Sequence, residues 1–483
     1  MCGVASFLGA IFFLVVCLFL HSLGIGRWSF ASAMLMALCI DGVYWFFVVK
    51  NDMRSFSLKF AFVGMAMLKV FPIGMCLVVP FSEDYLFPWS EYLFTAPVTA
   101  GLAGVIRTTS IVVVYLISRM FFVSKFYDVP IQKMLFRTSP RYEFFLAFAG
   151  VINLLYWLSL TALDNPIFYF VRILDKTLLV VPFFVGLTAF KYKKVTIFWC
   201  GVLLIQLMIA FLTGTRGAAF TPMIYFLVGF VIGLPGWNAR IRWGASFVLP
   251  LSVALLVAGV FIGSARNVTG RTDLKGALTE GSMIDALQSS VMSSQVSHRG
   301  NAPSEAFRRL TLWPEYVVPV MTPNPIPYRG FSDFMYEIRA SFGLGIFALI
   351  NPNWQGTYYL ANIHLQPYGF AVHVGADGMQ TSSVELPIQI DAFMRGGWFF
   401  AFVFTVFGYS VVFLVERLLR NRLLPRRQPL FLMILMMLCY IAFARFNKSG
   451  LVDSMRQLVM EGGFSLVVYY LFDRGLKRLG KPE

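Results

Sequence analysis

The stretch FLTGTRGAAF, Phe211 to Phe220, places a glycine-flanked arginine between two apolar runs. One run begins at Phe198, and the other continues through Leu234. Because a helix needs about 20 apolar residues to cross a bilayer, this pattern predicts two membrane-spanning helices joined by a tight turn. Arg216 then lies at the tip of the hairpin, and its role depends on the side that the tip faces.

The whole chain of 483 residues has the same apolar character. Hydrophobic residues make up 58% and charged residues 13%, with a mean hydropathy of +0.72, whereas a soluble domain has about 25% charged residues. The sequence therefore predicts an all-α polytopic integral membrane protein that lies in a lipid bilayer. The six cysteines have no metal-type spacing, so we interpret them as packing residues.

We expect about twelve membrane spans. They cover residues 3–23, 28–49, 60–81, 97–122, 144–163, 167–190, 195–212, 217–235, 245–263, 398–416, 429–445 and 457–472. The connecting segments alternate between basic and acidic character, and the basic side is cytoplasmic by the positive-inside rule. Both termini are expected on that side. The net charge of +16 follows largely from these basic loops and does not indicate nucleic-acid binding.

The spans divide the chain into three expected regions. Residues 1–263 carry the first nine spans, residues 264–397 form one large periplasmic loop, and residues 398–483 carry the last spans and a cytoplasmic tail. The loop contains the proline-rich stretch WPEYVVPVMTPNPIPYRGF, Trp313 to Phe331. A loop of this length is usually functional.

Four arginines fall at the outer edge of the expected spans: Arg216, Arg266, Arg395 and Arg445. Each alone is compatible with snorkelling to headgroups or pairing with loop acids. Together, on the face that basic residues normally avoid, they favour an anion site. Guanidinium groups bind phosphate bidentately and keep their charge in a dry setting. A lipid-linked sugar presents a diphosphate at this depth.

Charged residues also occur inside the expected spans: Asp41, Lys69, Arg107, Arg119, Arg172, Asp175 and Lys176. Ionisable groups at such depth are paired or functional by default. Arg172 and Asp175 are three residues apart and can satisfy each other on a helix. We interpret the set as chiefly structural, whereas a transporter would use these charges directly.

Three stretches resemble the Wzy-type O-antigen polymerases, including the enterobacterial common antigen polymerases. They are TGTRGAAF (213–220), the outer stretch VVPVMTPNPIPYRGFSDF (317–334) with SSVELPIQIDAFMRGGWFF (382–400), and ARFNKSGLVDSMRQLV (444–459). The resemblance implies a metal-independent glycosyltransferase of GT-C-like architecture in the bacterial inner membrane. It would move a glycan from undecaprenyl diphosphate to a lipid-linked repeat unit at the periplasmic face. It also implies a flippase and a chain-length co-polymerase as partners.

Glycosyl transfer requires a group that takes a proton from the acceptor hydroxyl. The candidates on the outer side are Glu315, Asp333, Glu337, Glu385, Asp391, His298, His364, His373 and Asp453. We favour Asp333 or Glu337, because Arg329 and Arg339 can hold them ionised, and Arg339 is also a candidate substrate contact. No metal or nucleotide motif is evident, so no cofactor is expected.

Two other functions stay open at this point. An O-antigen ligase would use the same donor and deliver it to lipid A core. A lipid-linked oligosaccharide flippase or other transporter would perform no chemistry.

Overall fold

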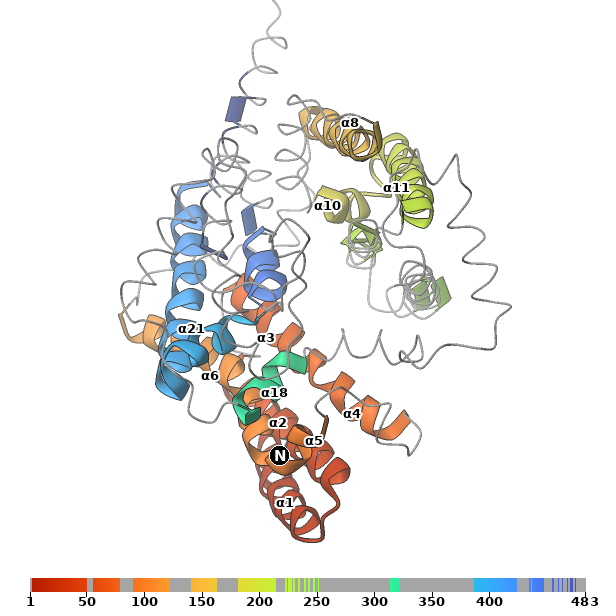
Figure 1. The fold of residues 1–483 in the computed structure, drawn as a ribbon. Helices are drawn as coiled ribbons and strands as arrows, with labels where there is room; N and C mark the ends of the chain where they lie inside the picture. Colours follow the sequence, from red (N-terminus) through yellow and green to blue (C-terminus); the bar gives the residue numbers. More distant parts are fainter. Residues whose placement is uncertain are drawn as a thin grey trace, which may run out of the picture. The chain divides into compact units, whose positions relative to one another are not determined.

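A computed structural model describes helices in several parts of the chain (Figure 1). The described residues are 2–49, 55–78, 90–121, 140–162, 181–213, 313–321, 386–423 and 437–446, with single residues or short groups between 222 and 251, at 434–435 and between 454 and 474. All regular elements within them are helical. Four of the described helices are long and apolar enough to span a membrane: Cys2–Ser22, Gly26–Val49, Pro97–Met120 and Ile388–Arg420. The prediction of a helical membrane protein is confirmed to this extent.

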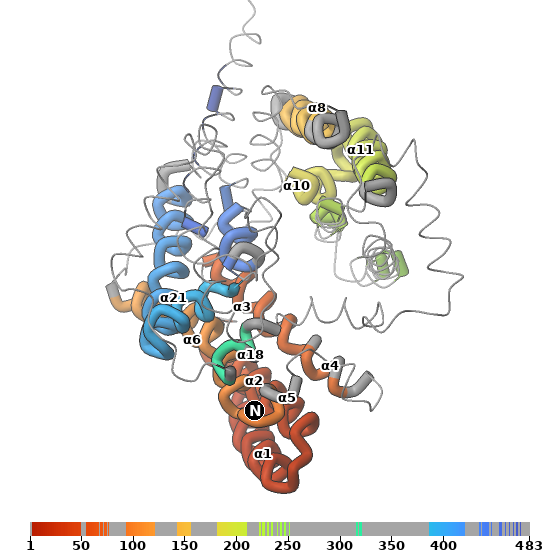
Figure 2. Tube along the Cα trace, in the orientation of Figure 1, coloured from red at the N-terminus to blue at the C-terminus, as the bar shows by residue number. Residues whose placement is uncertain are grey.

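The chain divides into two compact units, which we describe separately. Unit 1 comprises Met1–Tyr127, Phe307–Arg426 and Leu435–Met460, and unit 2 comprises Asp128–Ala306, Arg427–Ile434 and Glu461–Glu483. In Figure 2 the red and orange helices of unit 1 share that unit with the teal and light-blue helices from the later part of the chain. Unit 1 is therefore assembled from segments far apart in sequence.

In unit 1, α1 (Cys2–Ser22) and α2 (Gly26–Tyr44) form an antiparallel hairpin, and the short π-helix η1 (Trp45–Val49) continues α2. Gly24 has a φ of 72°. It allows the N–H groups of Gly24 and Ile25 to donate to the carbonyls of His21 and Leu20, each at 3.0 Å, which ends α1 in a Schellman motif. Along α1 large apolar side chains such as Phe7 are exposed, as on a lipid-facing helix.

The expected span 60–81 is two helices in the structure, α3 (Phe56–Leu68) and α4 (Val70–Val78). Lys69 lies at the break between them. Pro72 accounts for this break, since a proline ring clashes with the carbonyl four residues earlier, here that of Leu68. Lys69 therefore lies where the backbone hydrogen-bond pattern of the helix is already interrupted.

The helix α6 (Pro97–Phe121), preceded by the short α5 (Ser90–Thr95), packs closely on α2. A Cβ added at Gly101 would lie 3.1 Å from the carbonyl oxygen of Ala33. Near the other end of the pair, the Tyr44 and Thr109 hydroxyls are 3.1 Å apart. Both contacts advance in the same direction along the two helices, so α2 and α6 run parallel, as the second and fourth of four serial spans must.

The later segments of unit 1 are α18 (Trp313–Met321), α21 (Ile388–Leu423) and the π-helix η5 (Ile441–Arg445). The α21 helix contains a sharp kink at Gly396 and Gly397, and Gly397 has the left-handed φ of 74°. Residues 388–395 are therefore a short segment before the expected span 398–416. Tyr316 and Val318 of α18 share one hydrophobic core with α2, α6 and this segment.

The kink folds α21 back on itself. The N–H of Ile388 donates to the carbonyl of Phe446 at 2.8 Å, and the Phe446 ring packs on Tyr409 with centroids 5.1 Å apart. In a continuous helix Ile388 and Tyr409 would lie about 30 Å apart. Since both contact Phe446, the first segment of α21 descends beside the following span.

Unit 2 contains α8 (Pro140–Ala162), α10 (Val181–Leu187) and α11 (Lys193–Thr213). The buried Trp199 indole donates to the carbonyl of Leu146 at 2.9 Å, and the Gln206 amide donates to Asn153; both pairs are 53 residues apart in sequence. A constant separation means that α8 and α11 run parallel, again as alternate spans do. Gln and Asn pairs of this kind join helices within membranes.

Candidate functional site

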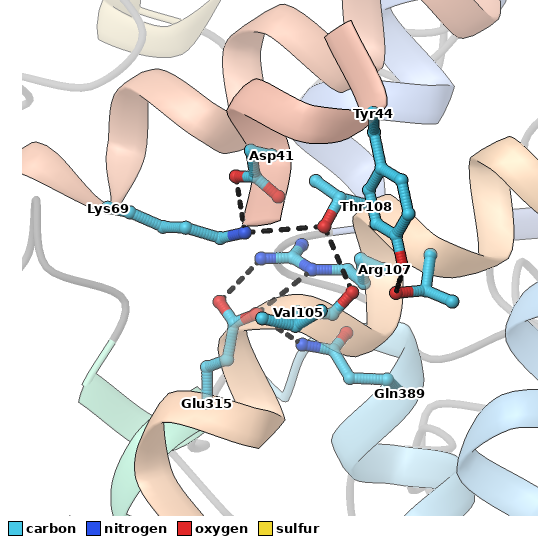
Figure 3. A network of polar contacts seen from close by, with 9 residues as sticks. Asp41, Tyr44, Lys69, Val105, Arg107, Thr108, Glu315 and Gln389 are labelled. Atoms are coloured by element: carbon cyan, nitrogen blue, oxygen red, sulfur yellow. Dashed lines mark hydrogen bonds and ion pairs between the residues drawn. The ribbon is translucent and has the colours of Figure 1, made fainter. Parts of the chain in front are cut away.

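Four charged side chains meet in the interior of unit 1 (Figure 3). Asp41, Lys69, Arg107 and Glu315 are each only 2% exposed. Lys69 Nζ lies 2.5 Å from Asp41 Oδ2, and Arg107 Nη2 lies 2.5 Å from Glu315 Oε2. Together with Gln389, we call these residues the charge cluster. Sequence reasoning identified Asp41, Lys69 and Arg107 as intramembrane charges, but not these pairings.

Each member of the charge cluster comes from a different element. Asp41 lies on α2, Lys69 at the break between α3 and α4, and Arg107 on α6. Glu315 lies in the first turn of α18, and Gln389 in the first turn of α21. The cluster therefore joins the early helices of unit 1 to two segments that were expected in the outer loop.

Glu315 is the most highly connected acceptor in the charge cluster. Its Oε1 accepts hydrogen bonds from Arg107 Nε at 3.2 Å and from Gln389 Nε2 at 2.7 Å, while its Oε2 accepts from Arg107 Nη2. The Arg107–Glu315 contact is bidentate, the geometry in which guanidinium and carboxylate bind most strongly. One carboxylate thus connects α6, α18 and α21.

The second ion pair is tied to the same helix α6. Lys69 Nζ also donates to the hydroxyl of Thr108 at 3.3 Å, and that hydroxyl donates to the carbonyl of Val105 at 2.9 Å. Thr108 follows Arg107 directly, so both cations of the charge cluster meet α6 at neighbouring positions. The two cations and two anions give the cluster no net charge.

The absence of a side chain at Gly104 brings α18 close to α6. A Cβ there would lie 3.2 Å from the Tyr316 ring and 3.7 Å from Cε of Lys69. A larger residue would push on both contacts. Gly104 is one turn before Arg107, so the approach it permits also brings Glu315 within reach of the guanidinium.

The charge cluster lies at the middle of a span. Arg107 is ten residues after Pro97, the first residue of α6, which corresponds to about 15 Å along the axis. The hydrocarbon core of a bilayer is about 30 Å thick. Because Glu315 pairs with Arg107 there, α18 contacts the middle of α6, although α18 belongs to the stretch that was expected as the outer loop.

Three polar atoms of the charge cluster are buried and have no hydrogen-bond partner among the described residues: Asp41 Oδ1, Arg107 Nη1 and Gln389 Oε1. Buried polar atoms are rarely left without a partner, because desolvating them costs free energy. The cluster therefore has unused capacity for one donor contact and two acceptor contacts. It has no such capacity for a metal: no group of three His, Cys, Asp or Glu side chains gathers in the described part of the chain.

Another buried carboxylate, Glu416, lies in unit 1 outside the charge cluster. Glu416 of α21 caps the first turn of α3: it accepts from the N–H groups of Phe56 and Ser57 at 2.9 and 3.1 Å, from Ser55 Oγ at 2.6 Å, and from Ser57 Oγ. A carboxylate at a helix N-terminus also interacts favourably with the helix dipole. Glu416 and Ser55 were both expected near the cytoplasmic side, and the structure brings these two residues into contact.

Two of the predicted site residues can be placed. Arg395 lies just before the kink of α21 and pairs with Asp391, with Nη2 to Oδ1 at 3.2 Å. Arg445 is the last residue of η5, next to Phe446, whose carbonyl binds the start of α21. The backbones of two expected outer-edge arginines thus belong to neighbouring segments.

The other predicted site residues lie outside the described residues: Arg216, Arg266, Asp333, Glu337 and Arg339. Their assignments stay predictions. Gln389 was not identified from the sequence. Its position was the available signal, because Pro387 directly precedes α21 and Gln389 is the first polar side chain of that helix.

Comparisons with protein-family models, with curated proteins and with solved structures found no match to this chain.

Proposed function

We propose that the protein is a polysaccharide polymerase, a glycosyltransferase that acts on lipid-linked glycans in the bacterial inner membrane. The observation that supports the proposal is the contact, within unit 1, between described parts of two stretches that resemble the Wzy-type polymerases: the outer stretch (317–334 with 382–400) and the stretch 444–459. The α18 helix, whose residues 317–321 belong to the outer stretch, contacts the first segment of α21 through Glu315, just before that stretch, and Gln389. That segment binds Phe446, in the third stretch, through the N–H of Ile388.

Convergence supports a shared site because these stretches are distant in sequence. Glu315 and Gln389 are 74 residues apart, and Phe446 follows a further expected span. Segments that merely connect spans need not contact one another. On this proposal, about twelve spans thread the membrane with both termini cytoplasmic, and the site faces the periplasm.

The chemistry of the proposed site follows from its arginines. Transfer from undecaprenyl diphosphate develops charge on the leaving diphosphate, and fixed donors aimed at that charge lower the barrier. Arg216, Arg266, Arg395 and Arg445 are the proposed contacts, with Arg339 on the substrate and Asp333 or Glu337 as the base. Asp391 keeps the Arg395 guanidinium oriented beside the kink. No cofactor is required, and a flippase and a chain-length co-polymerase are the proposed partners.

The charge cluster is also compatible with an alternative function, that of a transporter. A lipid-linked oligosaccharide transporter would use paired charges at the centre of its spans, and Lys69 and Arg107 lie at such a position. A ligase would share the proposed donor site and differ in its acceptor. Purified protein with lipid-linked repeat units separates these functions: a polymerase lengthens the glycan, a transporter does not, and a ligase requires lipid A core.

The same assay tests Arg216. Loss of two charge-assisted hydrogen bonds of roughly 1.5–3 kcal/mol each predicts that Arg216→Ala lowers polymer formation by about 100-fold or more, since about 1.4 kcal/mol is a factor of ten. Arg216→Lys should restore only part of the activity, because an ammonium lacks the bidentate fork. Arg242→Ala, at an exposed arginine expected on the cytoplasmic side, is the matched control and should polymerise normally. Full activity of Arg216→Ala at normal protein levels would remove Arg216 from the site.

A further inference from the structure

The contacts of Glu315 connect two segments that flank residues 322–385. The α18 helix ends at Met321, and the described chain resumes at Leu386. Glu315 and Gln389 therefore lie within a few residues of these two points, and they share a hydrogen bond of 2.7 Å. Through the bidentate contact with Arg107, both are fixed to the middle of α6.

The hydrophobic contacts follow the same pattern. Tyr316 and Val318 of α18 share a core with Leu386, just before α21, and with Ile390 and Phe393 of α21. Each of these five side chains is at most 3% exposed. The apolar contact packs the two segments against each other, and the carboxylate connects the pair of them to α6.

We propose that Glu315 is a positioning residue that couples α18 and the first segment of α21, so that the two segments dock onto Arg107 together. The coupling rests on the described contacts alone. Its consequence for catalysis rests on the proposed polymerase function, because the first segment of α21 leads directly to Arg395 before the kink. Glu315 binds Gln389, which lies two residues before Asp391, the partner of Arg395. Glu315 therefore acts on the proposed site indirectly.

The physical reason for coupling is the buried charge of Arg107. With Glu315 in place, the guanidinium has a bidentate partner, and the carboxylate has enough lone pairs to accept from Gln389 as well. Without Glu315, a charge is left at the centre of the span, and the surrounding segments must move to admit water or lipid headgroups. Such movement displaces α18 and, through Gln389, the first segment of α21.

Hydrogen exchange of the full-length protein in nanodiscs tests this coupling by comparing amides of residues 313–321 and 388–395. Glu315→Ala should lower protection in both segments by about 100-fold or more. Gln389→Met keeps the Arg107–Glu315 pair and removes only the hydrogen bond between Glu315 and α21. It should lower protection in residues 388–395 by about tenfold or more and leave α18 protected.

Glu416→Gln is the matched control, because it weakens a buried carboxylate with several hydrogen bonds in the same unit. It should increase exchange at the start of α3 and leave residues 313–321 and 388–395 protected. If Glu315→Ala does not fold, the double variant Arg107→Gln/Glu315→Gln removes both charges and keeps an acceptor for Gln389. This variant should retain protection of both segments, and the further change Gln389→Met should then release residues 388–395 alone.

The coupling is overturned if Glu315→Ala releases α18 while residues 388–395 stay protected, or if Glu416→Gln releases all of these segments equally. Polymer formation measured on the same samples separates this inference from the proposed function. The predicted exchange pattern without polymer from the unaltered protein would leave the coupling standing and refute the polymerase. Polymer from the unaltered protein without the exchange pattern would do the reverse. If both hold, Gln389→Met should lower polymer formation together with the protection of residues 388–395.

Discussion

The Asp41–Lys69 pair offers a direct measurement of how much the charge cluster contributes to stability. Both side chains are 2% exposed, and their charged atoms are 2.5 Å apart. Removing one partner of such a buried pair costs about 3–5 kcal/mol, because the other charge stays buried without compensation. Asp41→Asn and Lys69→Met should each lower the free energy of unfolding by that amount.

The double variant Asp41→Asn/Lys69→Met should be much less destabilised than the two single changes together. Neutral replacements of similar volume leave no buried charge, so we expect it within about 2 kcal/mol of the unaltered protein, whereas additive single effects would give roughly 6–10 kcal/mol. The double-mutant cycle then yields a coupling of at least about 4 kcal/mol. The Lys69 contact with Thr108, at 3.3 Å, contributes little of this.

Unfolding by SDS in mixed micelles, followed by tryptophan fluorescence, measures all four free energies under one condition. Additive destabilisation by the two changes would refute the reasoning, because it would mean that Asp41 and Lys69 are stabilised by other groups rather than by each other. Equal stability of all four proteins would mean that water reaches the pair and that the site is not dry.

Two further predictions concern other contacts. Glu416→Gln should lower the free energy of unfolding by about 2–3 kcal/mol, because four hydrogen bonds to the first turn of α3 lose their charged acceptor; an unchanged SDS midpoint would contradict this role. Gly229→Ala should destabilise unit 2 by about 1–3 kcal/mol, since the new Cβ would collide with the backbone of Phe183. The control is Gly201→Ala on α11, where the new Cβ would meet open space. It should be neutral or stabilising by up to about 1 kcal/mol. Similar SDS midpoints for both glycine variants would show that α10 does not pack there.

The helical class and the main apolar helices were predictable because hydropathy reports directly on what lipid allows. The expected spans 3–23 and 28–49 agree closely with α1 and with α2 continued by η1. The break at Lys69 was not predicted, although Pro72 signals it through a local steric rule. Hydropathy averages over a window of residues, so a single helix-breaking position does not change its value enough to be seen.

The partners of the buried charges could not be predicted for a different reason. Local rules pair residues three or four apart on a helix, and they correctly apply to Asp391 and Arg395. Asp41 and Lys69 are 28 residues apart, and Arg107 and Glu315 are 208 apart. Pairs of this kind form only when whole helices pack, and sequence periodicity contains no information about which helices meet.

The separation of Arg107 from Glu315 has a consequence for synthesis of the protein. At about 5–20 residues per second, the 208 residues between them take roughly 10–40 s to translate. During that interval α6 enters the membrane with Arg107 at its centre, which costs roughly 2.5–3.5 kcal/mol on insertion scales. Asp41 and Lys69, 28 residues apart, can meet within seconds by the same rates. The apolar residues around Arg107 and the helices made earlier therefore have to offset the cost of inserting α6. The α18 helix, which carries Glu315, joins these helices only afterwards.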